Sequence, residues 1–229
     1  MKLKILTIGV ISALFFSSFI VTANNTIFRD DFDSKSSHWA WYSVRSGYHL
    51  INDGIVEITV PHAFRICRHE SALVTNCTQQ KQPYRYNNMY ARIRFEGTLK
   101  GSRGWGFWNT VHNPFNYSFA WFMYQKGSPL NPLNGFWVMS TDGLLKGFQL
   151  KRIKGYDLSE WHDYGINWTE ESVSFYIDGD CVANFTSNVP RDYCRIHIWN
   201  DNAFYAFIPI YQRFLFSEKI FVDWFEITE

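Results

Sequence analysis

The most constraining feature of this sequence is a succession of short, β-rich segments that turn residues separate about every ten positions. Long helical periodicity is absent. The segments that we predict as strands are 54–60, 89–97, 104–109, 118–125, 135–140, 147–153, 162–169, 172–186, 194–200 and 219–228. About a dozen strands in roughly two hundred residues predict an all-β fold of two packed sheets, either a sandwich or a jelly roll.

The N-terminus has the three parts of a secretory signal. Lys2 and Lys4 give a charged start, residues 5–20 are mostly apolar, and 21–23 are small residues suited to cleavage. A membrane anchor is the alternative, but the apolar stretch is shorter than the ~20 residues that a span requires. We therefore expect residues 1–23 to be a signal peptide and the mature protein to be secreted, periplasmic or extracellular.

The remaining chain, residues 24–229, is predicted to form a single β-sandwich domain. Without Lys2 and Lys4 it has 20 basic and 21 acidic residues, which gives a net charge of −1. A nearly neutral chain offers no electrostatic reason to expect nucleic acid or an anionic lipid surface as a partner. No further segment is apolar for long enough to cross a bilayer, so we expect no membrane span in the mature chain.

All four cysteines lie in the mature part, and an even number in an exported chain favours disulfides. Three pairings are possible. We favour Cys67 with Cys77 and Cys181 with Cys194, because each closes a short loop. A four-cysteine zinc site is disfavoured because the sequence has no Cys-x-x-Cys pair. Phosphate-binding and dinucleotide-binding motifs are also missing, so we expect no metal and no cofactor.

An ordered set of segments resembles the family-sixteen glycoside hydrolases. "SEWHDYGINWTEESVSFYIDGDCV" (159–182) is similar to that family's His-x-Tyr-x-x-x-Trp segment, which runs into a Phe-Tyr-x-Asp-Gly hairpin. The other similar segments are "MYARIRFEG" (89–97) followed by "GWGFWN" (104–109), then "RIHIWNDN" (195–202) and "FVDWFEI" (221–227). The resemblance extends from about residue 28 to the end and implies a concanavalin-like jelly roll of the lectin and glucanase class. In this fold two curved antiparallel sheets form a glycan-binding groove on the concave face.

The catalytic strand of that family carries Glu-x-Asp-x-x-Glu, in which the first Glu is the nucleophile and the last is the acid/base. Alternate strand residues share a face, and a bulge brings the last Glu to the same side. The best counterpart here is "AWFMYQ" (120–125), with Ala120, Phe122 and Gln125 at the matching positions. No Asp or Glu occurs between Glu96 and Asp142. An amide cannot replace a carboxylate as nucleophile or acid, so we predict that this lineage's hydrolytic chemistry is missing.

Most acidic residues elsewhere in the sequence are poor candidates for replacement catalytic groups. Asp142, Asp178 and Asp180 lie in predicted turns, and His162 corresponds to a structural strand residue in the resembling family. Relocated catalytic residues, if there are any, are Glu70, Glu57 or His112, where Glu70 lies in the charged segment "FRICRHESA" (64–72).

Aromatic residues make up 19% of the chain, and several fall on strands that the resemblance places across the concave face. Because strand residues alternate between faces, we expect about half of them in the core. Trp105 and Trp199, with neighbouring Asn200, are the first choices for sugar contacts by carry-over from the family. The full set of expected substrate-binding residues is Trp105, Trp108, Asn109, His112, Trp121, Tyr124, Gln125, Trp199 and Asn200; Trp137 is a further aromatic on these strands.

Three functions remain open on these observations. The first is an exported glycan-binding protein without hydrolase activity. The second is a glycoside hydrolase or lyase with relocated catalytic residues. The third is a structural envelope protein whose groove is filled by its own aromatic side chains, such as Phe122 and Tyr124.

Overall fold

The structure, a computed structural model, describes residues 25–33, 38–61, 67–73, 83–109, 114–127, 129, 131–205, 209–211 and 215–229. The expected signal peptide, Cys77 and His112 lie outside these residues. Within them, no helix is long and apolar enough to cross a bilayer.

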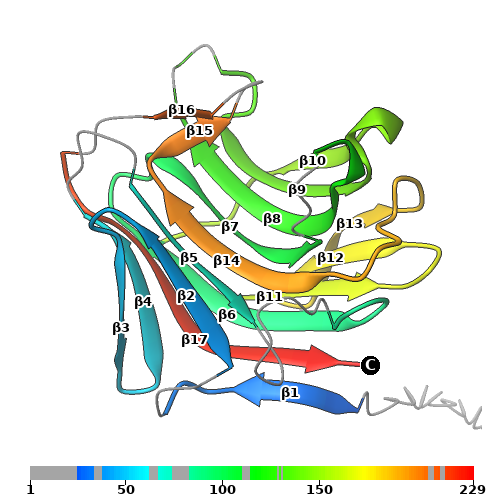
Figure 1. The fold of residues 1–229 in the computed structure, drawn as a ribbon, viewed down its shortest axis with the longest axis horizontal. Coiled ribbons are helices and arrows are strands. Elements are labelled where there is room, and N and C mark those ends of the chain that lie inside the picture. The colour runs from blue at the N-terminus through cyan, green and yellow to red at the C-terminus, as the bar shows by residue number, and fades with distance from the viewer. Residues whose placement is uncertain are drawn as a thin grey trace, which may run out of the picture.

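Two antiparallel sheets pack against each other in the described part of the chain (Figure 1). An eight-stranded sheet has the order β13-β12-β11-β6-β17-β4-β3, and β1 also pairs with β17. Its strands are β1 (Thr26–Asp30), β3 (Tyr48–Asn52), β4 (Ile55–Val60), β6 (Asn88–Glu96), β11 (His162–Trp168), β12 (Val173–Ile177), β13 (Asp180–Phe185) and β17 (Glu218–Thr228).

A seven-stranded sheet has the order β10-β9-β8-β7-β14-β5-β2. Its strands are β2 (Trp39–Val44), β5 (Arg68–Leu73), β7 (Gly101–Trp108), β8 (Ser118–Lys126), β9 (Gly135–Asp142), β10 (Gln149–Ile153) and β14 (Arg195–Asp201). Figure 1 shows β8, β9 and β14 as arcs whose hollow side is turned away from the eight-stranded sheet. The predicted all-β jelly-roll class is therefore confirmed.

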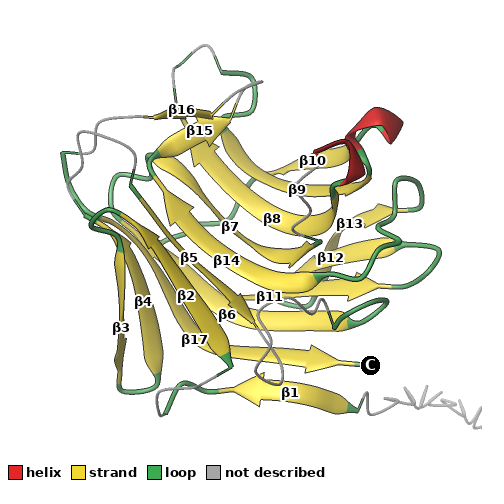
Figure 2. Cartoon of the chain, viewed as in Figure 1, coloured by secondary structure: helices red, strands yellow, loops and turns green. Residues whose placement is uncertain are grey.

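Three small elements complete the described fold, as Figure 2 shows. A short hairpin joins β15 (Ala203–Tyr205) to β16 (Pro209–Tyr211) beyond the end of β14. Two 3₁₀ turns, η1 (Pro114–Asn116) and η2 (Leu144–Lys146), are the helical segments among the described residues.

The main core lies between the two sheets and is built by strand alternation. Trp105 and Phe107 of β7, Phe122 of β8 and Ile93 and Phe95 of β6 are almost completely buried there. Burying a large apolar side chain stabilises a fold by about 1.5–3 kcal/mol. Some of the many aromatic side chains of the sequence thus fill the core between the two sheets.

The predicted hairpin turn at Asp178-Gly179 is confirmed between β12 and β13. Both residues have positive φ, 52° and 87°. This pair of left-handed residues is what a two-residue hairpin turn needs, and Asp-Gly supplies it at low conformational cost.

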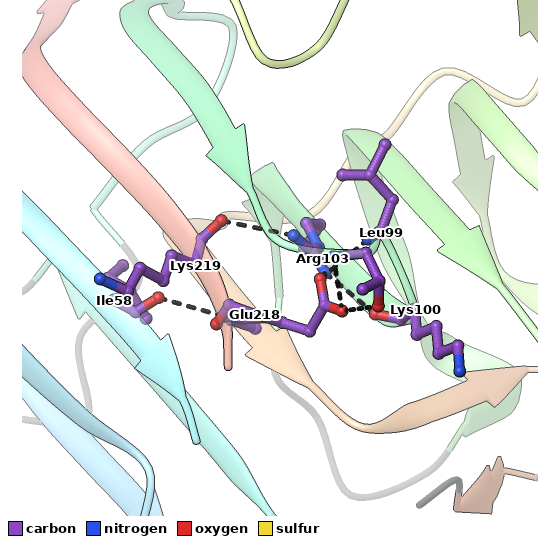
Figure 3. A network of polar contacts seen from close by, with 8 residues as sticks. Ile58, Leu99, Lys100, Arg103, Glu218 and Lys219 are labelled. Atoms are coloured by element: carbon purple, nitrogen blue, oxygen red, sulfur yellow. Dashed lines mark hydrogen bonds and ion pairs between the residues drawn. The ribbon is translucent and has the colours of Figure 1, made fainter. Parts of the chain in front are cut away.

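A buried polar network joins the two sheets near the start of β17 (Figure 3). Arg103 of β7 donates from Nη2 to Oε2 of Glu218 at 2.6 Å, and both side chains are almost fully buried. The backbone amides of Thr98 and Leu99 also donate to the Glu218 carboxylate, at 3.0 and 2.9 Å. The second carboxylate oxygen and the guanidinium thus both have partners, which is the condition under which a buried charge pair is tolerated.

The structure corrects the predicted cysteine pairing. Cys67, Cys181 and Cys194 are free thiols. Cys194 is fully buried beside Tyr84 in the core, whereas Cys181 is exposed on the edge strand β13. Closeness in sequence therefore does not bring Cys181 and Cys194 together, because they belong to different parts of the sandwich. Cys67 is buried and lies 3.8 Å from the hydroxyl of Ser46.

Candidate functional site

The hollow side of the seven-stranded sheet, which we call the aromatic face, is defined by strand register. Residues paired across antiparallel strands point to the same side of a sheet. One row crosses this side from β5 to β10 through Glu70, Trp199, Gly104, Met123, Trp137 and Arg152. The adjacent row contains His197, Gly106, Trp121, Met139 and Leu150. Trp108 and Phe119 pair in the row beyond it.

The rings on the aromatic face form a cluster of their own, separate from the main core. Phe119, Met123 and Met139 are buried in it, and the partly buried side chains around them are Trp108, Tyr117, Trp121, Trp137 and Trp199. The rings of Phe119 and Trp121 stack at 3.6 Å, and Trp199 meets Trp121 edge-on at 5.2 Å. Such ring pairs contribute about 0.5–1.5 kcal/mol each beyond area burial, so the cluster holds its tryptophans in place.

Two glycines of β7 make room for these rings. A Cβ added at Gly104 would lie 2.5 Å from the Trp199 ring and 2.3 Å from the backbone oxygen of Phe122. At Gly106, whose φ is +147°, it would lie 2.3 Å from the backbone oxygen of Ala120. The segment "GWGFW" therefore presents bare backbone to this side, and indole rings from the neighbouring strands lie over it.

Hydrogen bonds orient the two tryptophans of the central row. Trp199 donates from Nε1 to the Ser102 hydroxyl at 2.9 Å, and Trp137 donates to the Leu133 carbonyl at 2.9 Å. The Arg152 guanidinium lies over the Trp137 ring, 5.9 Å from its centre. Both rings are thus fixed at the indole nitrogen, while part of each remains exposed to solvent.

Several polar atoms of this side have no hydrogen-bond partner in the described part of the chain. They include Nε1 of Trp108, Nε1 of Trp121, Nε2 of His197 and Nε of Arg195. Burial and the nearby charge of Arg195 lower the pKa of His197 to about 3, so its imidazole is neutral at physiological pH. Unpartnered buried polar atoms are uncommon in native proteins, and here they occur together.

Two aromatic residues expected to contact sugar lie in the main core instead. Trp105 is fully buried, stacked on Phe122 and edge-on to Tyr164 at 4.7 Å. Tyr124 packs in the same core. Strand alternation explains both corrections, because residues 105 and 124 have the opposite parity to Trp108 and Trp121 on their strands.

Asn200 and Asn109 are also structural. The Asn200 amide donates to the backbone oxygens of Ile58 and Glu218, at 3.1 and 2.7 Å, inside the core. Asn109 bridges the Asn116 carbonyl and the Asp192 carboxylate, at 2.8 and 3.0 Å. Neither amide is available to a ligand.

Apart from His112, which lies outside the described residues, the remaining predicted contacts do lie on the aromatic face. Trp108, Trp121 and Trp199 are partly exposed there, and Gln125 shares their side of β8 but is fully buried. Trp137 completes the set. These positions agree with a binding role, which stays a prediction.

β8 is the counterpart of the catalytic strand in the resembling family. The structure shows that the residues of β8 that face the hollow side are not those that the sequence suggested. Ala120 and Phe122, which the sequence suggested as matching positions, point into the core. The side chains on the hollow side are those of Phe119, Trp121 and Met123. Gln125 shares this side, so the four β8 side chains that face the hollow carry no carboxylate.

A charged group lies at one end of the aromatic face; the sequence had pointed to its charged segment 64–72 but not to its partner Asp201. Arg68 of β5 contacts Glu70 at 3.7 Å and Asp201 at 3.3 Å. Asp201 is fully buried and also accepts from the Ala203 amide at 2.9 Å. Burial raises the pKa of Glu70, and the charge of Arg68 partly opposes this. Asp201 lies on the same side of β14 as Trp199, two residues away, and that spacing was the only available signal.

Other acids considered from the sequence are remote from this side. Glu57 of β4 lies on the outer surface of the eight-stranded sheet, where it pairs with Lys219 at 3.2 Å. Among the described residues, no group of three His, Cys, Asp or Glu side chains could hold a metal ion.

The strand order and the bowed seven-stranded sheet define a concanavalin-like jelly-roll sandwich, the fold of the β-glucanases. The family model described as "Glycosyl hydrolases family 16" matches residues 143–200. A comparison with curated protein sequences finds no match. The chain is thus related to family-sixteen glycoside hydrolases by this matched segment and by its fold, as the sequence resemblance predicted.

Solved structures agree with this relationship. The β-glucanase of Bacillus licheniformis superposes with a TM-score of 0.63 at 14% identity, over 88% of this chain and 97% of that one. A protein described as an immunostimulatory antigen and pseudo β-1,3-glucanase of Mycobacterium tuberculosis gives 0.64 at 10% identity, over 89% and 98%. A structure reported with endo-acting O-glycanases of the human gut microbiota gives 0.63 at 13% identity, over 89% and 99%. At such identities the likeness establishes the fold alone.

Proposed function

We propose that the protein binds a polysaccharide along the aromatic face and does not hydrolyse it. The observation that carries the proposal is the set of partly exposed tryptophans on the hollow side of a glucanase-like sheet, Trp108, Trp121, Trp137 and Trp199. Sugar rings present C–H faces that pack on indoles and hydroxyl edges that need hydrogen bonds. The partly exposed carboxylate of Glu70 is a polar group at hand for the hydroxyls.

The chemistry that β8 lacks supports the second half of the proposal, that the protein does not hydrolyse the polysaccharide. Glycoside hydrolysis uses two carboxyl groups, one on each side of the scissile bond. β8 supplies none on the aromatic face, and two acids at the end of this face, Glu70 and Asp201, share the Arg68 guanidinium. The neighbour described as a pseudo-glucanase supports the idea that this fold can persist without the activity.

The test is binding to laminarin and lichenan by affinity electrophoresis or calorimetry. We expect Trp137→Ala and Trp199→Ala each to weaken binding about tenfold, because each removes one stacking ring. Trp161→Ala is the matched control, since Trp161 is a partly exposed tryptophan outside the aromatic face that contacts Arg94. Equal affinity of the two face variants and the control would contradict the proposal.

A hydrolase with relocated residues is the second candidate, and one observation favours it. Glu70 has a raised pKa and pairs in register with Trp199, so it could serve as a general acid. The assay is release of reducing ends from the same polysaccharides. Activity that disappears in Glu70→Gln while binding remains would establish this alternative and overturn the non-hydrolytic proposal.

We also propose that the protein is exported after removal of residues 1–23, which is supported by the three-part N-terminus. N-terminal sequencing of the protein released by its source cells should begin at Asn24. A product that still starts at Met1 and remains in the membrane fraction would favour an anchor.

A further inference from the structure

A pocket of about 270 Å³ opens on the outer surface of the eight-stranded sheet, opposite the aromatic face. We call it the Gly165 pocket. Side chains from β6, β11, β12 and β17 line it, among them Tyr90, Asp163, Asn167, Tyr176 and Trp224. No sequence feature had pointed to this place.

The pocket exists because β11 has a glycine at its centre. Gly165 pairs in register with Tyr90 of β6 on one side and Tyr176 of β12 on the other. Asp163 and Asn167 lie two residues before and after it, on the same side of β11. Four side chains therefore surround one missing side chain. A Cβ at Gly165 would lie 3.1 Å from the Tyr90 ring, so even alanine would press on this wall.

The walls combine ring surfaces with neutral hydrogen-bonding groups. Tyr90, Tyr176 and Trp224 are all partly exposed. The Tyr90 hydroxyl donates to Oδ1 of Asn167 at 2.9 Å, which leaves the amide nitrogen of Asn167 to donate elsewhere. Burial raises the pKa of Tyr90, which keeps its phenol protonated.

Charge in the pocket is low. Asp163 is the one ionisable carboxylate in its lining, and the Arg92 guanidinium lies 3.8 Å from it. No lysine or arginine belongs to the lining. Two guanidiniums border the pocket, and both already have carboxylate partners: Arg92 contacts Asp163 and Asp223, and Arg29, which lies over the Trp224 ring at 5.1 Å, contacts Asp31 and Glu226. The pocket therefore offers no unpaired cation to a phosphate or carboxylate ligand. Its volume is just below the roughly 300–1,000 Å³ of sites for drug-sized ligands, which suits a ligand of one or two rings.

We propose that the Gly165 pocket is a second saccharide-binding site, which takes a neutral sugar unit of one or two rings at the outer surface of the sandwich. The tyrosine and tryptophan rings pack on the C–H face of the sugar, and Asn167 and Asp163 bond its hydroxyls. The site does not rest on the function proposed for the aromatic face, because it uses different residues on the other sheet.

The experiment titrates the full mature chain with laminarihexaose, cellohexaose and agarohexaose, followed by calorimetry and by shifts of backbone amide resonances. The double variant Trp137→Ala, Trp199→Ala isolates the Gly165 pocket from the aromatic face. We expect at least one sugar to bind this double variant and to shift the amides of β11 and β12. Adding Tyr176→Ala should then weaken that binding about tenfold.

Two further variants keep the result interpretable. Gly165→Ala places a methyl group at the centre of the pocket, 3.1 Å from the Tyr90 ring, without removing a ring, and it should weaken binding by a similar factor. Tyr48→Ala is the control, because Tyr48 is an exposed tyrosine of the same sheet on β3, away from the pocket. If the double variant binds none of the sugars, or if Tyr176→Ala and Gly165→Ala leave binding unchanged, the second site is refuted. The proposal for the aromatic face survives either outcome, since it depends on the wild-type comparison alone.

Discussion

His197 is the residue whose environment gives the clearest pH dependence. It lies against the Trp108 ring at 4.9 Å, and its pKa falls from 6.5 to about 3 because it is buried and faces the charge of Arg195. The unfolded chain therefore binds a proton at this residue below about pH 6.5, while the folded chain does not. The free energy of unfolding therefore does not depend on His197 above about pH 6.5. It decreases as the pH falls from there toward 3, because only the unfolded chain takes up the proton.

We predict that His197 costs the wild type up to about 2 kcal/mol of unfolding free energy between about pH 7.5 and pH 5, at ~1.4 kcal/mol per pKa unit. Urea unfolding of the wild type and of His197→Gln at both pH values measures the effect. Glu70 acts in the opposite direction, because its raised pKa makes the folded state take up a proton first, but it is present in both proteins. A pH dependence that is the same in the two proteins would contradict the assignment.

β7 is the element in which the sequence was informative but incomplete. "GWGFWN" correctly indicated a strand with alternating faces. It did not indicate which face is inside, because both sides of this sheet bury aromatic rings. Trp105 was therefore placed on the wrong side, whereas Trp108 lies on the aromatic face. The two glycines, Gly104 and Gly106, mark the aromatic face, because only the side on which rings from neighbouring strands cover β7 requires residues without side chains.

The strands rich in alternating apolar residues were predictable, as was the Asp178-Gly179 turn. β2 and β3 were missed because they lie at sheet edges and carry exposed residues, and β5 was missed because it lies next to an edge and begins with the charged segment 68–70. The contact of Arg68 with Asp201 could not be predicted from the sequence, for another reason. It joins residues that are far apart in the chain, and a single sequence contains no information on such pairing.

Replacing Gly104 should disturb β7 locally. The added Cβ of Gly104→Ala meets rigid backbone of β8 and the Trp199 ring, so one of them has to move. We predict a loss of about 1–3 kcal/mol of stability, together with a changed fluorescence of the aromatic face. Gly155→Ala is the control, because Gly155 has open space around its Cβ and carries only the strain of its φ of +91°. Wild-type stability of Gly104→Ala would show that the rings are not tightly held.

The two sheets of the whole molecule are connected by the Arg103–Glu218 pair. Removing one partner of a fully buried pair leaves an uncompensated charge, which typically costs about 3–5 kcal/mol. We predict a loss of this size for Glu218→Leu in urea unfolding. The double change Arg103→Met, Glu218→Leu should restore a large part of it, because both charges are then gone.

The control for this prediction is the exposed pair of Arg29 and Asp31, 2.7 Å apart at the surface. Asp31→Asn should change stability by less than about 1 kcal/mol, since solvent already screens those charges. A similar effect of the buried and exposed substitutions would mean that solvent reaches the interior end of β17.

The stacked rings of Phe119 and Trp121 limit how this fold could gain a glucanase's chemistry by mutation. A carboxylate introduced at position 119 or 123 would enter a dry, ring-packed layer, where it would stay protonated and could not attack a sugar. A nucleophilic carboxylate could therefore not be created on β8 by exchanging Phe119 or Met123 alone. The neighbouring indoles would first have to be cleared so that water could reach the strand, and each such step would weaken the packing that now fixes the tryptophans.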